Sequence, residues 1–446
     1  MKEILLTIII TIGFIHAEEW IYFNHMNDFE YNYGASDADY SASRISPDGS
    51  VSEMILDDIP YSDISDDGTK LLYIEYEQIE DVNWDMVEPV SFSIYNTETS
   101  ETISSITGIS PADVRFTHDE NIVLYMDGSQ YSNGQLYKYS FEDSSSTMLS
   151  DSLSAAFNNM TMSPDGQQVL YFKLAEDENA DNSYMDYEVI VSHIETGEST
   201  TLAAIPYYYG FEGLGVWDNS PIWSDNGFIY LTSLDDNNCA QLIGIHSSLG
   251  YITQLTDNPC TGEIVYYCVP SILNTKETDL DKFIYSVCSD LGMGTYNWIY
   301  DIESGESSFL DSLYSEIGVV SFSIDQSWSP DGTKVSFSEI LYNGWVSVPP
   351  KIRVYDTVTE SFQILSNGND LYDPESYYIA SPINWIEDGL AGDVNGDDSV
   401  DVLDVVMLVS YILSGDTSEL DGADINNDGD INVLDIVAIV QVILGN

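Results

Sequence analysis

The chain has 446 residues and a formal net charge of −65, with 76 acidic residues against 11 Lys and Arg. So acidic a surface repels nucleic acid and anionic lipid, and we expect neither as a partner. The length suits one large all-β domain with a smaller appendage, so we expect two unequal domains.

The first segment, residues 1–17, has the pattern of a secretory signal. Lys2 precedes an apolar run from Ile4 to Ile15, and Ala17 stands before two glutamates. The run is shorter than the ~20 residues that a membrane span needs, and no later segment is apolar enough for one. We predict cleavage after Ala17 and a secreted protein, extracellular or at the cell surface, without a membrane span. An uncleaved anchor is the alternative.

A turn motif recurs at intervals of about fifty residues through residues 18–390. It suits a tight turn, because Pro presets the first corner and Gly accepts a positive φ. β-branched and aromatic residues flank it and predict strands. The copies are Ser-Asp-Asp-Gly at 65–68, Ser-Pro-Asp-Gly at 163–166 and 329–332, and Ser-Asp-Asn-Gly at 224–227, with weaker copies at 117–120, 274–281 and 386–389.

A second hairpin follows in each repeat, with turns such as 96–99, 195–197, 303–305 and 356–359. Two hairpins per repeat predict a blade of four antiparallel strands. The repeat resembles that of TolB-type β-propellers of exported bacterial proteins. This resemblance implies that residues 18–390 form a β-propeller, so that the fold is mostly β.

The two ends of this region predict how the ring closes. The strand-like run 381–385 leads into the last turn motif, but no second strand follows it. Residues 20–23 form a strand that lacks a preceding partner. We expect one shared blade, with its inner strand from the C-terminal end and three strands from the N-terminal end, which leaves no open edge. Six further repeats give seven blades.

Longer connections gather on the face opposite the tight turns, and we expect a ligand there. Their aromatic side chains, set among carboxylates and amides, suit the sugar rings of a polysaccharide or a cationic peptide. The alternative is that these rings only pack the loops and blade seams. The candidates are Trp84, Tyr184, Tyr207, Tyr208, Tyr209, Trp217 and Trp345.

All four cysteines lie between residues 239 and 288 of a chain predicted to be exported, where disulfides persist. If residues 240–255 form a hairpin turning near Ser248, Cys239 comes close to Cys260, and the other two cysteines lie symmetrically about Thr278. A metal site is disfavoured, because no C-x-x-C pair occurs and the nearest histidine, His246, is alone. The favoured bridges, among three pairings, join Cys239 to Cys260 and Cys268 to Cys288.

Two loops near the C-terminus carry oxygen donors at the spacing of a calcium site. Seven-coordinate calcium takes positions 1, 3, 5 and 12 of such a loop, the backbone of position 7 and often a water at position 9. The loops lie 31 residues apart, each before an apolar helix predicted at 402–413 or 433–444. The predicted ligands of two calcium ions are Asp393, Asn395, Asp397, Ser399 and Asp404, and Asp424, Asn426, Asp428, Asp430 and Asp435.

Apolar residues recur at helical spacing in both predicted helices and predict a shared core. A core this small is marginal, so we expect calcium to supply much of the folding free energy. The predicted core residues are Val405, Leu408, Val409, Ile412, Ile436, Ile439, Val440 and Ile443.

Residues 391–446 resemble a type I dockerin, because both loops end in Asp where EF-hands use Glu and no helix precedes the first loop. The resemblance implies a small all-α domain that docks onto a cohesin-like domain of a scaffoldin or cell-surface protein, most often to deliver polysaccharide-degrading enzymes. It also implies partner contacts at loop positions 10 and 11, often Ser-Thr in the best-known members and here Val402, Leu403, Val433 and Leu434. A calcium-stabilised clip without a cohesin partner is the alternative.

The sequence shows no catalytic signature. Neither G-x-S-x-G nor H-E-x-x-H occurs, and we interpret the scattered His25, His118, His193 and His246 as structural. Glycosidases need only two carboxylates, which this chain has in excess, so the enzyme question stays open. One hypothesis is a non-catalytic binding propeller, displayed through its dockerin. The other is a propeller-fold polysaccharide hydrolase of O-glycosyl bonds, or a lyase.

Overall fold

The structure is a computed structural model that divides into two compact units, one of Ile21–Ile386 and one that contains Glu387–Asn446. The predicted signal, residues 1–17, lies outside the described residues. The structure describes residues 19–32, 35–57, 59–80, 85–97, 99–119, 121–128, 134–141, 144–153, 160–174, 184–208, 221–236, 240–257, 271–273, 275, 280–288, 294–314, 320–342, 347–365, 383–387, 392, 394, 400, 402–414, 423, 425 and 431–444.

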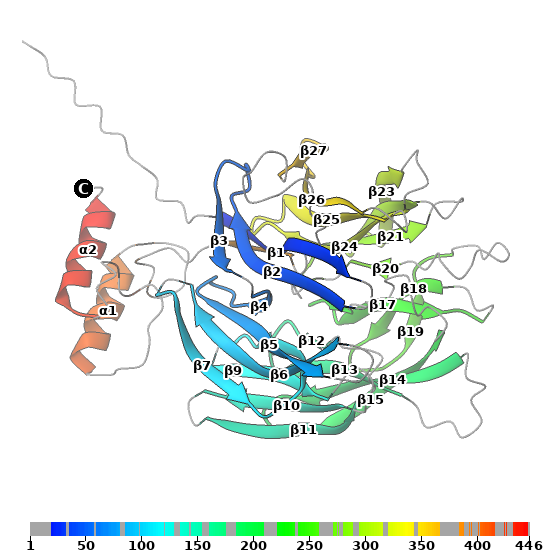
Figure 1. The fold of residues 1–446 in the computed structure, drawn as a ribbon, viewed down its shortest axis with the longest axis horizontal. Coiled ribbons are helices and arrows are strands. Elements are labelled where there is room, and N and C mark those ends of the chain that lie inside the picture. The colour runs from blue at the N-terminus through cyan, green and yellow to red at the C-terminus, as the bar shows by residue number, and fades with distance from the viewer. Residues whose placement is uncertain are drawn as a thin grey trace, which may run out of the picture. The chain divides into compact units, whose positions relative to one another are not determined.

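The larger unit is a seven-bladed β-propeller, as predicted, and its described strands form seven four-stranded sheets (Figure 1). In sheet order, blade 1 has β28 (Ile383–Glu387), β1 (Glu19–Asn32), β2 (Ala35–Ile45) and β3 (Ser52–Leu56). Blade 2 has β4 (Tyr61–Ile64), β5 (Lys70–Glu80), β6 (Asp85–Asn96) and β7 (Glu101–Thr107). Blade 3 has β8 (Pro111–Phe116), β9 (Ile122–Asp127), β10 (Gly134–Ser140) and β11 (Ser145–Leu153).

The remaining blades follow the same meander from inner to outer strand. Blade 4 has β12 (Thr161–Met162), β13 (Gln168–Leu174), β14 (Tyr184–His193) and β15 (Ser199–Tyr208). Blade 5 has β16 (Ile222–Trp223), β17 (Phe228–Leu234), β18 (Ala240–His246) and β19 (Ile252–Gln254). Blade 6 has β20 (Ser271–Ile272), β21 (Lys282–Cys288), β22 (Gly294–Asp301) and β23 (Glu306–Tyr314), and blade 7 has β24 (Val320–Trp328), β25 (Lys334–Tyr342), β26 (Ser347–Asp356) and β27 (Ser361–Ile364).

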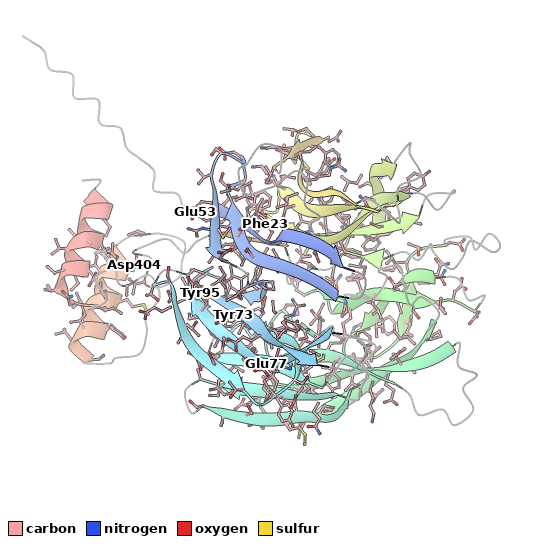
Figure 2. All side chains as sticks on the ribbon, viewed as in Figure 1. Phe23, Glu53, Tyr73, Glu77, Tyr95 and Asp404 are labelled. Atoms are coloured by element: carbon pink, nitrogen blue, oxygen red, sulfur yellow. The ribbon has the colours of Figure 1, made fainter. Side chains whose placement is uncertain are left out.

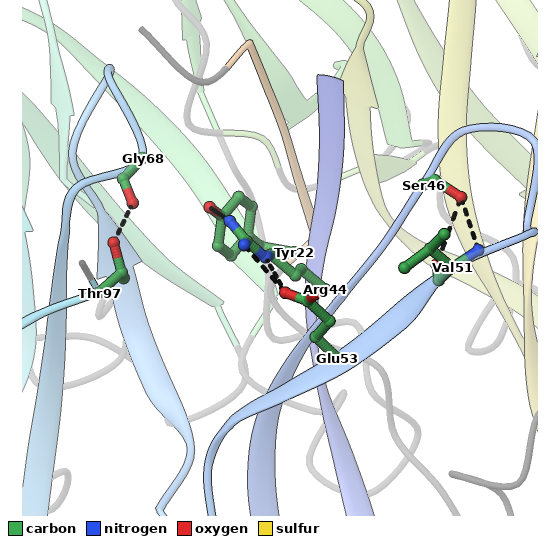
Figure 3. Close-up of polar contacts among 7 residues, drawn as sticks. All are labelled: Tyr22, Arg44, Ser46, Val51, Glu53, Gly68 and Thr97. Atoms are coloured by element: carbon green, nitrogen blue, oxygen red, sulfur yellow. Dashed lines mark hydrogen bonds and ion pairs between the residues drawn. The ribbon is translucent and has the colours of Figure 1, made fainter. Parts of the chain in front are cut away.

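The shared blade is confirmed, because β28 from the C-terminal end pairs with β1 from the N-terminal end. In this blade Arg44 on β2 links the two neighbouring strands, β1 and β3. Its guanidinium donates to the Tyr22 hydroxyl on β1 at 3.2 Å and lies 2.9 Å from the Glu53 carboxylate on β3 (Figure 3). The ring therefore closes through strand pairing and is reinforced by side chains of the same blade.

The Ser-Pro-Asp-Gly turns form because their side chains satisfy the backbone locally. In blade 7 the Ser329 hydroxyl donates to Asp331 at 2.6 Å and accepts the Lys334 amide at 2.9 Å, while Gly332 takes φ 65°. The same contacts recur around Ser46, whose hydroxyl bonds to both backbone groups of Val51 (Figure 3). Each motif thus closes its hairpin without help from distant residues.

The core lies between neighbouring blades. Phe92 on β6 and Phe116 on β8 belong to one buried cluster that joins blades 2 and 3. Phe23 on β1 and Val354 on β26 belong to another, which joins blades 1 and 7. A fully buried side chain of this size contributes about 1.5–3 kcal/mol, so these seams supply much of the stability of the ring.

Buried side chains also carry hydrogen bonds from one blade to the next. The Asn24 amide of blade 1 exchanges two bonds with the backbone of Tyr61 in blade 2, at 2.7 and 2.9 Å. The Asp63 carboxylate accepts the Phe116 amide at 2.7 Å, and the Ser327 hydroxyl accepts the Trp385 amide at 2.6 Å. These side chains complete backbone pairing where the next blade's inner strand has no strand partner.

Candidate docking module and propeller channel

The C-terminal unit is built on two helices, α1 (Val402–Ser414) and α2 (Val433–Leu444), which pack against each other. Leu408 and Ile439 are fully buried at their contact. The core predicted for these helices is confirmed for Leu408 and Ile439, with Val405, Ile412 and Ile436 packed against them. It is wrong for Val440 and Ile443, which are exposed because the helices turn these positions away from the contact. Val409 is half-buried and outside this cluster.

Apolar residues from the loops complete this small core. Val394 and Ala423 are buried in it, and Ile425 and Ile431 pack against it. Each helix is therefore held by residues that precede it in its own repeat, which couples helix packing to the conformation of the loops.

The carboxylate at position 12 of each loop is fully buried at the start of its helix, and Figure 2 places Asp404 on α1. Asp404 accepts the Val394 amide at 2.9 Å. Asp435 accepts the Asn432 amide at 2.8 Å while the Asn432 side chain accepts the Leu434 amide at 2.9 Å, which is a reciprocal helix cap.

These two carboxylates fit a bound calcium ion. Calcium takes carboxylate oxygens as ligands, and residues 391–446 contain no Lys, Arg or His that would compete with an ion for them. Bound calcium would also offset the electrostatic cost of burying each carboxylate. The other predicted ligands lie outside the described residues, and the described residues alone include no group of three or more His, Cys, Asp or Glu suited to a metal.

The predicted partner-contact residues are exposed at the start of the helices. Val402 and Leu403 open α1, and Val433 and Leu434 open α2. All four side chains are more than half exposed. Apolar side chains as exposed as these are accessible to another protein.

A polar cluster lies where the inner strands of four blades meet in the propeller. The Arg115 guanidinium donates to Asp113 at 3.1 Å, and the Tyr61 hydroxyl donates to Asn384 at 3.1 Å. Burial raises the pKa of the Asp113 carboxyl, against the lowering effect of Arg115. Burial, followed by the charges of Asp325 and Asp63, raises the pKa of Tyr61 well above its ordinary value.

A cavity of about 530 Å³ opens on the side of the tight turns. Six blades line it, with the polar groups of Asp66, His118 and Asp281 and the rings of Trp328 and Trp385. Its volume falls within the usual range of ligand pockets. No sequence pattern predicts this cavity, because the residues that line it are spread over 321 positions of the chain.

The structure does not describe the side chains that the sequence predicts on the aromatic face. Trp84, Tyr209, Trp217 and Trp345 lie outside the described residues. Tyr184 on β14 pairs with Tyr208 on β15, and Tyr207 pairs with Met185, but their side chains are not described. A ligand on this face stays a prediction.

The hairpin predicted between residues 240 and 255 is confirmed, since β18 and β19 pair antiparallel with Ile245 opposite Ile252. Cys239, Cys260 and Cys268 lie outside the described residues. Cys288 ends β21 opposite Thr295, but its side chain is not described. The two disulfides stay predictions.

Two histidines have a structural role. The Nδ1 atoms of His193 and His246 each accept two backbone amides of the hairpin turn that follows, at 3.2–3.4 Å. Asp356 accepts the two corresponding amides in blade 7, and Asp301 accepts the Ser304 amide in blade 6. These imidazoles therefore replace a turn carboxylate. His118 packs close to Gly166, and the side chain of His25 is not described.

Fold and site together define a β-propeller protein that carries a small two-helix module after the propeller. Residues 391–444 match the family model of the dockerin type I domain. Domains of this family bind calcium and dock to cohesins, and they typically occur in extracellular proteins. No helix in the described part of the chain is long and apolar enough to cross a membrane.

Solved structures show the same propeller fold at low sequence identity. Prolyl oligopeptidase B from Galerina marginata, bound to a 25mer macrocyclization substrate, aligns with a TM-score of 0.52 and 13% identity over 80% of this chain and 50% of its own. The β-propeller domain of the Trilobed protease from Pyrococcus furiosus aligns with a TM-score of 0.50 and 10% identity over 80% and 96%. TolB from Acinetobacter baumannii aligns with a TM-score of 0.35 and 13% identity over 67% and 69%. Among curated proteins no match to this chain was found.

Proposed function

We propose that this is a secreted protein that docks onto a cohesin through residues 391–446 and presents its propeller as a binding module in extracellular polysaccharide breakdown. The observation that carries the proposal is the match of residues 391–444 to the dockerin type I domain, together with the fully buried carboxylates of Asp404 and Asp435 at the predicted calcium positions. A module of this composition needs calcium to fold, and calcium is abundant outside the cell.

Two calcium ions are part of the proposal, one for each loop. Asp404 and Asp435 would supply the last ligand of each ion. Each carboxylate stands at the start of its helix and also accepts a backbone amide, from Val394 and Asn432 respectively, so it would link the ion to the helix. The ligands Asp393, Asn395, Asp397 and Ser399, with Asp424, Asn426, Asp428 and Asp430, complete the two sites. Calcium would thereby fix the angle at which each helix leaves its loop.

The contact residues would be Val402, Leu403, Val433 and Leu434. Their exposure supports this role, because apolar side chains that face water gain free energy when a partner covers them. They stand where the sequence places positions 10 and 11 of each loop.

The propeller would bind a neutral polysaccharide. The net charge of −65 on the whole chain disfavours anionic ligands, and the cavity on the tight-turn side offers planar polar groups beside indole rings. A peptide with positive charge is the competing ligand. The cavity and the opposite aromatic face are separate candidates for this site.

Catalysis is the second candidate function. It is favoured by one observation, the buried Asp113 carboxyl, whose pKa burial raises despite the nearby Arg115, since a raised pKa is the direction that a glycosidase acid requires. Incubation of the full chain with a panel of polysaccharides decides between the two. Binding without product supports the binding module, whereas released oligosaccharide establishes a hydrolase or lyase.

Calorimetry tests the docking function. We expect the full chain to bind calcium and, only with calcium, a type I cohesin module. Asp404→Ala with Asp435→Ala should abolish both, whereas Asp48→Ala in the propeller should leave both unchanged. Calcium binding that survives the double substitution would refute the assigned sites.

A further inference from the structure

The two helices expose matching apolar side chains. Positions 31 residues apart have nearly equal exposed fractions, at 64% and 62% for Val402 and Val433 and at 56% for both Leu403 and Leu434. The match extends one turn along each helix, where Val406 and Val437 are 57% and 50% exposed. Each repeat therefore presents the same three-residue apolar patch, formed by Val402, Leu403 and Val406 in the first and by Val433, Leu434 and Val437 in the second.

These patches differ from the other exposed apolar residues because they occur twice. In the described propeller such residues stand on different strands and turns, and the close group of Leu249, Tyr251 and Ile252 is not repeated there. In the helices they stand one turn apart, at the spacing that brings them onto one side. An apolar surface that is concentrated and repeated in this way marks a contact with another protein.

The module offers a partner no positive charge. Residues 391–446 include eleven Asp and one Glu but no Lys, Arg or His. An acidic docking face on the partner would find no cation to pair with and would be repelled. Bound calcium would offset part of this charge, but it lies inside the loops.

We infer that the partner is a cohesin whose docking face is aliphatic and free of acidic side chains, and that Val406 and Val437 are specificity-determining contacts beside the pairs at positions 10 and 11. The inference rests on the proposed docking function and adds the chemistry of the partner surface to it. Charge then affects how fast the two proteins meet, while the apolar contact sets how slowly they part.

The test measures binding kinetics of the full chain with calcium against recombinant type I cohesin modules, some with aliphatic and some with acidic docking faces. We expect binding only to the aliphatic group. Between ~50 and ~500 mM NaCl the dissociation rate should stay within about twofold, because salt screens charge but not apolar contact. Val406→Thr with Val437→Thr keeps the side-chain shape and should raise the dissociation rate at least about tenfold. Val358→Thr, at a 75% exposed position in blade 7, is the matched control and should change nothing.

Three results would overturn the inference while the docking function stands: preference for acidic cohesins, a dissociation rate that rises about tenfold with salt, or an unchanged rate in the Thr double variant. Sedimentation of the chain alone tests whether a second copy of the chain, rather than a cohesin, covers the two apolar patches. A calcium-dependent dimer that the double variant abolishes would assign the patches to a second copy. Failure to bind any cohesin would instead refute the docking function itself.

Discussion

The side chain of Gln326 offers the sharpest test of how the blades are held together. Its amide, fully buried on β24 of blade 7, reaches into blade 6. The oxygen accepts the Ile284 amide at 2.7 Å, and the nitrogen donates to the Leu273 carbonyl at 2.8 Å and to the Ile284 carbonyl at 3.2 Å. The side-chain amide of Gln326 thus makes the hydrogen bonds that a backbone peptide group would make just beyond the end of β20.

Gln326→Met keeps the length and volume of the side chain and removes its polar groups. The Ile284 carbonyl keeps a bond from the Leu273 amide at 3.1 Å, so two backbone groups lose their partner, the Ile284 amide and the Leu273 carbonyl. A buried unsatisfied group costs about 1–3 kcal/mol, so we expect the free energy of unfolding to fall by about 4 kcal/mol.

Equilibrium unfolding in urea with calcium present, followed by tryptophan fluorescence, measures this loss. Gln363→Met is the matched control, because Gln363 also bridges two blades, donating to the Asp48 carbonyl at 3.0 Å, but is exposed. The control should stay within about 0.5 kcal/mol of the wild type. A loss below about 1 kcal/mol in Gln326→Met would refute the reasoning that side-chain amides complete the neighbouring blade.

Three further outcomes follow from the structure. Chelation of calcium should abolish the helical circular dichroism of α1 and α2 and leave the propeller's thermal transition in place; helices that persist would refute calcium-dependent folding. The bond from Ser329, followed by that from the Thr333 amide, lowers the pKa of Asp331 below 3.8, so its stabilisation is present above pH 3.8 and is lost as pH falls through the lower folded value. The melting temperature of Asp331→Asn should therefore lie below that of the wild type at pH ~7 and converge with it at pH ~2, and a constant gap would contradict this. His193→Ala should lower the free energy of unfolding by about 1 kcal/mol and His193→Asp should restore it, because the turn needs only an acceptor; no rescue by Asp would count against that role.

Much of the fold was predictable because its determinants are local. The turn around Ser329 closes with contacts inside six residues, and the residues on either side have strand propensity. The shared blade was also predictable, since an unpaired strand at each end of the repeat has only one partner available. The helix bounds came from the same kind of signal, with α2 as expected and α1 one residue longer.

The helix faces were less predictable. Helical periodicity alone placed Val440 and Ile443 in the core, but both are exposed. In these helices nearly every position is apolar, so period cannot tell which stripe faces the partner helix and which faces water. The loop residues Val394 and Ala423 take the core positions instead, and their role depends on the path of the loops.

The sequence by itself determined the blade count, the closure and the calcium-loop spacing, because each depends on residues a few positions apart. Only the tertiary structure decided which polar side chains lie buried between blades and which blades line the cavity. Tyr61 and Asn384 are 323 residues apart and share a hydrogen bond. Such a contact depends on the angle between blades, which is set by the packing of the whole ring and leaves no periodic trace in the chain.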